Sequence, residues 1–215
     1  MGAVPARALA RRTWSPPDVL GVSGYKGQRP RRSRHPPRMT DKHALRAMLR
    51  ERRDAMVRRD LPVSDAFINA LAPGRTVASY VPVGGEADPA ALVESALAAG
   101  CSIALPHVAS RSEPMRFLLW RPGEPLVRGA FGLMQPKVDA PQAEPDVILT
   151  PLVGFDRCGN RIGQGAGFYD RAFVAHPAAW RVGVAWSVQE VGKIDPDPWD
   201  VPLHAIATEK EWITP

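Results

Sequence analysis

The most conspicuous chemical feature of the sequence is a glycine-rich segment, GNRIGQGAGFYDR, at residues 159–171. Its alternating glycines, Gly163, Gly165 and Gly167, permit left-handed backbone angles and leave the neighbouring N–H groups uncovered by side chains. Free N–H groups at the start of a helix form an anion site, which the helix dipole strengthens. The segment therefore predicts a phosphate-binding turn that runs into a helix, as in an ATP-using enzyme.

Two charged residues favour phosphate over a purely structural glycine turn. Arg161 precedes the glycines and carries a guanidinium suited to phosphate oxygens. Asp170 comes just inside the predicted helix, where its carboxylate could hold a magnesium ion at the phosphates. The spacing differs from the Walker A motif, which needs Lys followed by Ser or Thr, and no long strand leads into the first glycine as in a Rossmann motif.

The composition is that of a globular protein with one main domain. The chain has 215 residues, of which 45% are hydrophobic and 23% charged. It has no run of about 18 apolar residues, so no membrane-spanning helix is predicted. Cys101 and Cys158 lack a metal-binding spacing and are too few for a disulfide framework, which favours the reducing cytoplasm.

The net charge of +6 is concentrated at the N-terminus. Residues 1–38 hold nine Lys or Arg and one acid, a net charge of +8, whereas the remainder holds 19 basic and 21 acidic residues, a net charge of −2. The N-terminal segment is also rich in proline and poor in large aliphatic residues, so it cannot bury enough surface to offset its ordering entropy. We expect residues 1–38 to be a disordered basic extension and residues 39–215 to be the folded domain.

Three interpretations of this extension remain open. An Arg-rich, acid-poor segment is typical of a targeting peptide, although such peptides usually avoid so many prolines. The cluster RPRRSRHPPR at residues 29–38 could bind nucleic acid. The favoured interpretation is a mis-assigned start, with the true protein beginning at Met39, because Thr40 is placed as the N-cap of the first patterned segment.

The hydrophobic pattern predicts helices alternating with strands. Helices are predicted over residues 41–56, 64–72, 88–99 and 167–174. Strands are predicted over residues 76–81, 102–105, 115–120, 147–150, 181–186 and 205–208. On the first helix, basic residues occupy a face away from the apolar one: Lys42, Arg46, Arg50 and Arg53. This alternation predicts an α/β sandwich with a largely parallel sheet.

The stretch PLVGFDRCGNRIGQGAGFYDR, residues 151–171, resembles the signature of the 5-formyltetrahydrofolate cyclo-ligase, or methenyltetrahydrofolate synthetase, family. Further resemblances follow in order, so that about residues 41–211 are covered: KHALR at 42–46, SYVPVGGEADPAALV at 79–93, LPHV at 105–108, GAFGLMQP at 129–136 and DPDPWDVPLHAIATE at 195–209. The resemblance implies a three-layer α/β/α sandwich with a mostly parallel sheet, of the NagB/RpiA/CoA-transferase-like kind.

The resemblance also implies a reaction. The family uses ATP and magnesium to convert 5-formyltetrahydrofolate to 5,10-methenyltetrahydrofolate. The formyl oxygen attacks the γ-phosphate, a second nitrogen closes the ring on the phosphorylated imine-like intermediate, and ADP and phosphate are released. Such phosphoryl transfer needs alignment and charge neutralisation rather than covalent help from the protein. We therefore expect a cytoplasmic, monomeric enzyme with a small-molecule substrate and no membrane partner.

Roles transfer by position. The resemblance places ATP at Lys42, Arg46, Arg161, Ile162, Gly163, Gln164, Gly165, Ala166, Gly167, Phe168 and Tyr169. It places folate at Glu86, Phe131 and Tyr169, magnesium at Asp170 and Asp200, and catalysis at Arg161 and Tyr169. Blander interpretations exist: Lys42 and Arg46 could form a solvated helix face, Glu86 a polar turn, and Phe131 or Tyr169 part of the core.

The sequence departs from the family pattern within the loop. Gln164 and Ala166 stand where many members carry Arg or Lys, so we expect Arg161, with Lys42 and Arg46, to supply the positive charge. Phe168 replaces a frequent Tyr. His204 stands where an acid is common, and we interpret it as structural.

Two other functions compete with the cyclo-ligase hypothesis. One keeps the fold and the nucleotide site but assigns another small molecule, such as a thiamine-related or sugar-phosphate compound, since one fold hosts many chemistries. Glu86, Phe131 and the pair Asp170 and Asp200 favour folate. The other is a nucleic-acid-binding protein that uses the basic extension, an idea to which the nearly neutral folded part gives no support.

Overall fold

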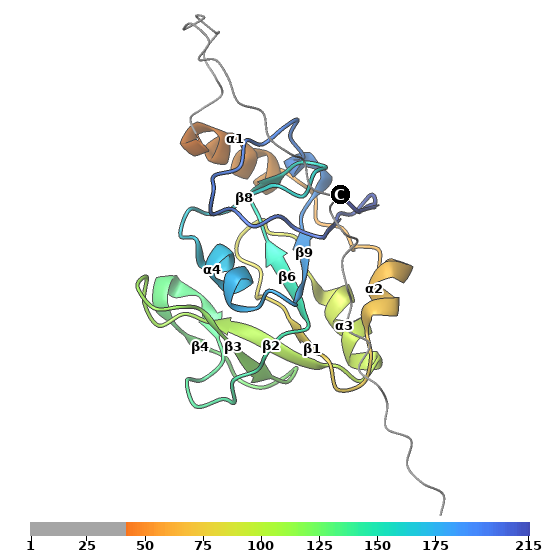
Figure 1. Cartoon of the computed structure of the whole chain (residues 1–215), viewed down its shortest axis with the longest axis vertical. Helices are drawn as coiled ribbons and strands as arrows, with labels where there is room; N and C mark the ends of the chain where they lie inside the picture. The colour runs from red at the N-terminus through yellow and green to blue at the C-terminus, as the bar shows by residue number, and fades with distance from the viewer. Residues whose placement is uncertain (1–41) are drawn as a thin grey trace, which may run out of the picture. The chain divides into compact units, whose positions relative to one another are not determined.

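The computed structural model describes residues 42–215, so residues 1–38 and the predicted cap Thr40 lie outside the described residues. Its centre is a seven-stranded sheet with the order β11-β10-β9-β6-β1-β2-β3 (Figure 1). The bounds of these strands are β1 Thr76–Ala78, β2 Ser102–His107, β3 Arg116–Trp120, β6 Val147–Pro151, β9 Trp180–Val184, β10 Ala205–Ala207 and β11 Trp212–Ile213. The five inner strands run parallel, and the edge strands β3 and β11 pair antiparallel. The predicted α/β class with a mostly parallel sheet is confirmed.

Helices cover both faces of the sheet. Their bounds are α1 Lys42–Asp54, α2 Asp65–Ala70, α3 Ala90–Ala98 and α4 Phe168–Ala175. In Figure 1, α2 and α3 lie together on one side of the sheet and α4 lies on the other. The strands alternate between two cores: Val147 and Leu149 of β6 pack with α2 and α3, whereas Ile148 packs with Phe173 of α4. This alternation is the period-2 geometry of a strand that is buried on both faces.

Two short hairpins form separate two-stranded sheets. One pairs β4 Val127–Arg128 with β5 Met134–Gln135, across the 3₁₀ turn Ala130–Gly132. The other pairs β7 Gly154–Phe155 with β8 Arg161–Ile162, and helix α1 packs Leu49 against this hairpin through Ile162. A second 3₁₀ turn covers Ser187–Gln189. The pairs β4–β5 and β7–β8 were not predicted, because two-residue strands are too short to show a period of their own.

The capping signals in the sequence locate the helices well. Ser64 caps α2 and accepts a hydrogen bond from the Phe67 N–H at 3.3 Å. Asp88 accepts one from the Ala90 N–H at 3.0 Å, at the start of α3. Strand β1 ends at Ala78, three residues before the predicted end, because the chain leaves the sheet there to line a cleft. Among the described residues, no helix is both long and apolar enough to cross a bilayer.

The strand order places a topological switch point between β1 and β6. From β1 the chain proceeds outward through β2 and β3, whereas from β6 it proceeds in the opposite direction through β9 and β10. In open parallel sheets, ligands bind beyond the carboxyl ends of the strands at such a point. The fold therefore predicts a site at the ends of β1 and β6.

Candidate active site

A cleft of about 1090 Å³ opens at this switch point. The residues that line it include Tyr80, beyond the end of β1, Val108, after β2, and Pro151, the last residue of β6. Every residue to which the sequence assigned a ligand lines this one cleft: Lys42, Arg46, Glu86, Phe131, the loop 161–169, Asp170 and Asp200. These residues come from five separate segments of the chain, so the fold brings the predicted nucleotide, folate and metal groups together.

The glycine-rich loop runs directly into α4, as predicted. Gly167 caps the helix with φ +66°, and Gly165 has φ +100°, so both occupy backbone regions that a side chain would strain. Gly163 lies outside the left-handed region, and an added Cβ would meet no atom within 4 Å. The left-handed freedom of the glycine run is thus used at two of its three positions.

Arg161 forms more contacts within the protein than its position in the sequence suggests. Its side chain is only 6% exposed, and its guanidinium donates to the Asp170 carboxylate and to the Val201 carbonyl oxygen. The guanidinium also lies 4.6 Å from the centre of the Phe173 ring. The predicted phosphate cation and the predicted metal carboxylate are therefore paired with each other, and Arg161 joins the loop, α4 and the segment after Asp200.

A second ion pair connects α1 to the segment that contains Asp200. The Lys42 ammonium donates to the Asp197 carboxylate and lies 3.7 Å from Oδ2 of Asp200. Oδ2 of Asp200 in turn accepts from the Asp197 N–H at 2.8 Å. Sequence reasoning missed Asp197, since one acid among three in DPDPWD carries no signal of its own.

Asp170 and Asp200 suit magnesium only in combination with another oxygen source. The described residues include no group of three or more His, Cys, Asp or Glu side chains that could hold a metal. Magnesium at phosphates is usually bound by one or two carboxylates, with phosphate oxygens and water completing the shell. The two carboxylates therefore fit a magnesium ion that arrives with a nucleotide.

Glu86 lies beside the glycine-rich loop and is nearly buried, with a side chain only 11% exposed. Its Oε2 accepts from the Val83 N–H at 3.0 Å, and its Oε1 lies 3.5 Å from Nε2 of Gln164 and 3.8 Å from Nη1 of Arg53. Burial raises the pKa of Glu86, while the Val83 hydrogen bond and the charge of Arg53 oppose that rise.

Sequence reasoning placed Arg53 on the basic face of the first helix without giving it a site role. Its side chain is 7% exposed, and its Nη1 has no hydrogen-bond partner among the described residues. A buried guanidinium without a full set of partners is costly, so its place beside Glu86 needs a compensating interaction. The signal was the helical spacing itself, because Lys42, Arg46 and Arg53 share one face with the cleft.

Two tyrosines in the cleft remain protonated. Burial raises the pKa of both Tyr80 and Tyr169, and the charge of Glu86 raises each further. The Tyr80 hydroxyl donates to the Ala87 carbonyl oxygen at 2.5 Å. Tyr169 can therefore act as a hydrogen-bond donor at neutral pH, but it cannot act as a base.

Phe131 is exposed rather than part of the core. The residue is 53% exposed, and its ring centroid lies 6.0 Å from that of Phe168. Its φ of +58° is rare for a bulky residue, and such backbone strain often occurs at ligand sites. The Arg111 guanidinium lies 5.5 Å from the Phe131 ring centre. This exposed aromatic surface is suited to stacking against a flat ring.

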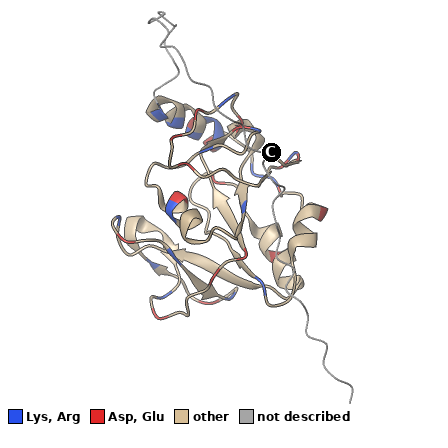
Figure 2. Ribbon diagram, viewed as in Figure 1, with Lys and Arg blue, Asp and Glu red and all other residues tan. Residues whose placement is uncertain are grey.

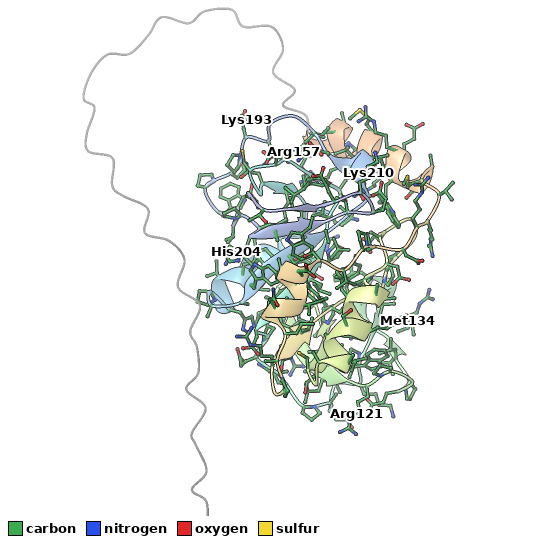
Figure 3. The ribbon with its side chains drawn as sticks, turned by 90° about the vertical axis from the view of Figure 1, so that its right-hand side faces the viewer. Arg121, Met134, Arg157, Lys193, His204 and Lys210 are labelled. Carbon is green, nitrogen blue, oxygen red and sulfur yellow. The ribbon has the colours of Figure 1, made fainter. Side chains whose placement is uncertain are left out.

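His204 lies away from the cleft, as its structural interpretation requires. In Figure 3 it is on the opposite side of the view from Met134, which lines the cleft. Its Nδ1 accepts from the Arg181 N–H at 3.1 Å, and its Nε2 lies 2.6 Å from the Arg181 guanidinium. Burial, together with Arg181, lowers the pKa of His204 to about 4.

This depressed pKa predicts a pH dependence of stability. The unfolded chain takes up a proton at His204 near the ordinary value of 6.5, whereas the folded protein resists it down to about 4, so stability is lost as the pH falls between these values. We expect His204→Asn, which retains a hydrogen-bond acceptor, to remove about 1–2 kcal/mol of that loss, after allowance for solvent screening of a half-buried ring. Urea unfolding of both proteins at pH 7 and pH 4.5 measures the difference, and equal losses would contradict the prediction.

Comparisons with known proteins identify the family of the chain. The model of the 5-formyltetrahydrofolate cyclo-ligase family matches residues 38–209. The 5-formyltetrahydrofolate cyclo-ligase of Escherichia coli (strain K12) is 38% identical over 146 residues, which cover 64% of this chain and 80% of that protein. The Mycolicibacterium smegmatis enzyme of the same name is 38% identical over 151 residues, 65% of this chain and 76% of that protein. The structure of Aquifex aeolicus 5,10-methenyltetrahydrofolate synthetase matches with a TM-score of 0.63 and 29% identity, over 80% of this chain and 92% of that one. The chain therefore belongs to the 5-formyltetrahydrofolate cyclo-ligase family.

Proposed function

We propose that the protein converts 5-formyltetrahydrofolate to 5,10-methenyltetrahydrofolate with ATP and magnesium, releasing ADP and phosphate. The observation that carries this proposal is the single cleft at the switch point, where the glycine-rich loop faces the Glu86 and Phe131 groups. A formyl oxygen is a poor leaving group, and phosphorylation by ATP makes it a good one. One cleft that receives both substrates supplies the alignment that this transfer needs.

The nucleotide phosphates are proposed to lie against the N-terminus of α4. The left-handed glycine backbone at Gly165 and Gly167 and the helix dipole favour anions there. Arg46 donates from Nε to the Gly163 carbonyl oxygen at 2.9 Å. This hydrogen bond keeps the guanidinium charge of Arg46 beside the loop. Magnesium held by Asp170 and Asp200 would supply neutralisation of the phosphate charge.

The folate is proposed to occupy the other part of the cleft. Glu86 accepts hydrogen bonds from N–H groups of the pteridine ring, and the exposed Phe131 stacks against the flat part of the molecule. Tyr169, held protonated by burial, donates a hydrogen bond to an oxygen of the reacting groups. Arg161 holds Asp170 and the loop in place for the transfer.

A spectrophotometric assay tests the proposal directly. Formation of the methenyl product from 5-formyltetrahydrofolate should require both ATP and magnesium. Well-folded protein that forms no product under these conditions would rule the proposal out. The same preparation, examined by light scattering, tests the proposal that the enzyme is a monomer, and cell fractionation tests the proposed cytoplasmic location.

We also propose that residues 39–215 form the catalytic domain and that the reaction does not need residues 1–38. Every cleft residue named above lies after residue 41. Removal of residues 1–38 is therefore expected to leave kcat and KM unchanged. Measurement of RNA and DNA binding by the full and shortened chains, at several salt concentrations, tests the competing role of the basic extension. A large loss of turnover on removal would contradict the proposal.

A further inference from the structure

Arg50 and Arg171 approach the glycine-rich loop from two different helices, α1 and α4. Arg50 donates from Nη2 and Nε to Oε1 of Gln164, at 2.6 and 3.2 Å. Arg171 donates from Nη1 to the Ala166 carbonyl oxygen at 3.2 Å, and its guanidinium lies 5.1 Å from the centre of the Phe168 ring. All five residues line the cleft. Each guanidinium is thus fixed to the loop rather than free in solvent.

The two guanidinium groups keep most of their donors available. A guanidinium carries five N–H donors, of which these hydrogen bonds use two on Arg50 and one on Arg171. Within the described part of the chain, neither arginine forms an ion pair with a carboxylate. Arg161 and Lys42, by contrast, are both paired with carboxylates. Among the described residues, Arg111, over the Phe131 ring, also lines the cleft without a carboxylate partner, but it has no hydrogen bond to the loop. Beside the loop, positive charge without a carboxylate partner is therefore supplied by Arg50 and Arg171, together with Arg46.

The loop itself contributes no charge. Residues 163–167 read GQGAG, so any cation beside bound phosphates has to come from another element. Figure 2 shows basic residues along α1 and a basic residue beside an acidic one on α4. Guanidinium groups match phosphate oxygens in geometry as well as in charge.

We propose that Arg50 and Arg171 are phosphate-binding residues, which place guanidinium charge from α1 and α4 beside the uncharged loop 163–167. The inference rests on the proposed use of ATP and adds two residues to that site. Gln164 and the Ala166 carbonyl hold these cations in place. The nucleotide site is thus completed by tertiary packing, because α1 lies more than a hundred residues before the loop.

A purely structural role would leave a different signature. If the arginines only shaped the loop, their removal would weaken the binding of every adenine nucleotide to the same extent. If they contact phosphates, the loss grows with the number of phosphates. Isothermal titration of the full chain with ATP, ADP and AMP separates the two cases, in the absence of folate so that no turnover occurs.

We expect Arg50→Gln and Arg171→Gln each to weaken ATP binding about tenfold, the usual effect of losing a charge-assisted hydrogen bond. The loss is expected to be smaller for ADP and absent for AMP. Arg50→Lys should retain most of the ATP affinity, because it keeps the charge. The matched control is Arg52→Gln, an exposed position on the same helix outside the cleft.

Gln164→Ala removes the partner of Arg50 but leaves its charge, so a loss smaller than that of Arg50→Gln would support the proposal. Equal losses for ATP and AMP in folded variants, or no loss for ATP, would overturn it. A wild-type chain that binds no ATP would instead contradict the proposed function itself, so the two failures are distinguishable. Thermal melting of each variant verifies that the protein titrated is folded.

Discussion

Asp170→Asn is expected to lower kcat about a hundredfold or more while the protein remains folded, a loss typical of removing one charge-stabilising group from an active site. The substitution keeps the size of the side chain and one oxygen that can accept from Arg161. It removes the negative charge that is proposed to hold magnesium beside the phosphates. The variant should therefore need a higher magnesium concentration for half of its maximal turnover. Turnover measured against magnesium concentration, at saturating ATP and folate, tests this.

The design separates the metal role from the ion pair. Asp170 is paired with Arg161, whose side chain is nearly buried, so the variant also tests that contact. Urea unfolding measures its contribution to stability, which we expect to be about 1–3 kcal/mol. Glu190→Gln is a control, because Glu190 pairs with Arg157 and neither residue lines the cleft. Wild-type turnover by Asp170→Asn at limiting magnesium would show that the proposed metal role is wrong.

Arg53→Met is expected to lower kcat/KM for folate about tenfold at mildly acidic pH, the scale of losing one hydrogen-bonded charge. Burial already raises the pKa of Glu86, and the charge of Arg53 holds that rise in check. Without the guanidinium the pKa rises further, so Glu86 is protonated over a wider pH range and accepts fewer hydrogen bonds from folate. The acid limb of the kcat/KM profile should therefore move to higher pH, and activity should recover as the pH is raised.

The tyrosines near Glu86 do not change charge over the pH range of this test. Tyr80 and Tyr169 lie close enough to interact with the carboxylate, and burial keeps both protonated across the range measured. Arg53→Lys keeps the charge and should preserve the wild-type profile, whereas Arg52→Met tests an exposed arginine of the same helix. A uniform fall in activity at every pH, without movement of the acid limb, would indicate that Arg53 acts only through packing.

Local sequence signals predicted the secondary structure with small errors. The Ser64 cap and the Asp88-Pro89 signal, together with the apolar runs, located α2, α3 and the inner strands, because these features depend on residues a few positions apart. The strand ends and the two-residue hairpins were missed. The end of β1 depends on where the chain leaves the sheet to meet the cleft, which no local pattern records.

For the site, too, local sequence signals predicted some features and missed others. The glycine run with Arg161 and Asp170 indicated the phosphate loop from the sequence alone, because neighbouring residues act together there. The resemblance added Glu86, Phe131 and Asp200, and the structure places them all in the same cleft. Their ligand roles are predictions that the experiments above test.

The sequence by itself therefore determined most of the elements and their order, and it predicted phosphate chemistry for the glycine-rich loop. Only the tertiary structure decided which charges meet there. It paired Lys42 with Asp197, set Arg53 beside Glu86, and fixed Arg50 to Gln164. These partners lie 155, 33 and 114 positions apart, and their contacts come from packing α1 against the β7–β8 hairpin rather than from any local pattern. Charge in this cleft is a property of the assembled fold, because the side chains that supply it come from elements that meet only when the core forms.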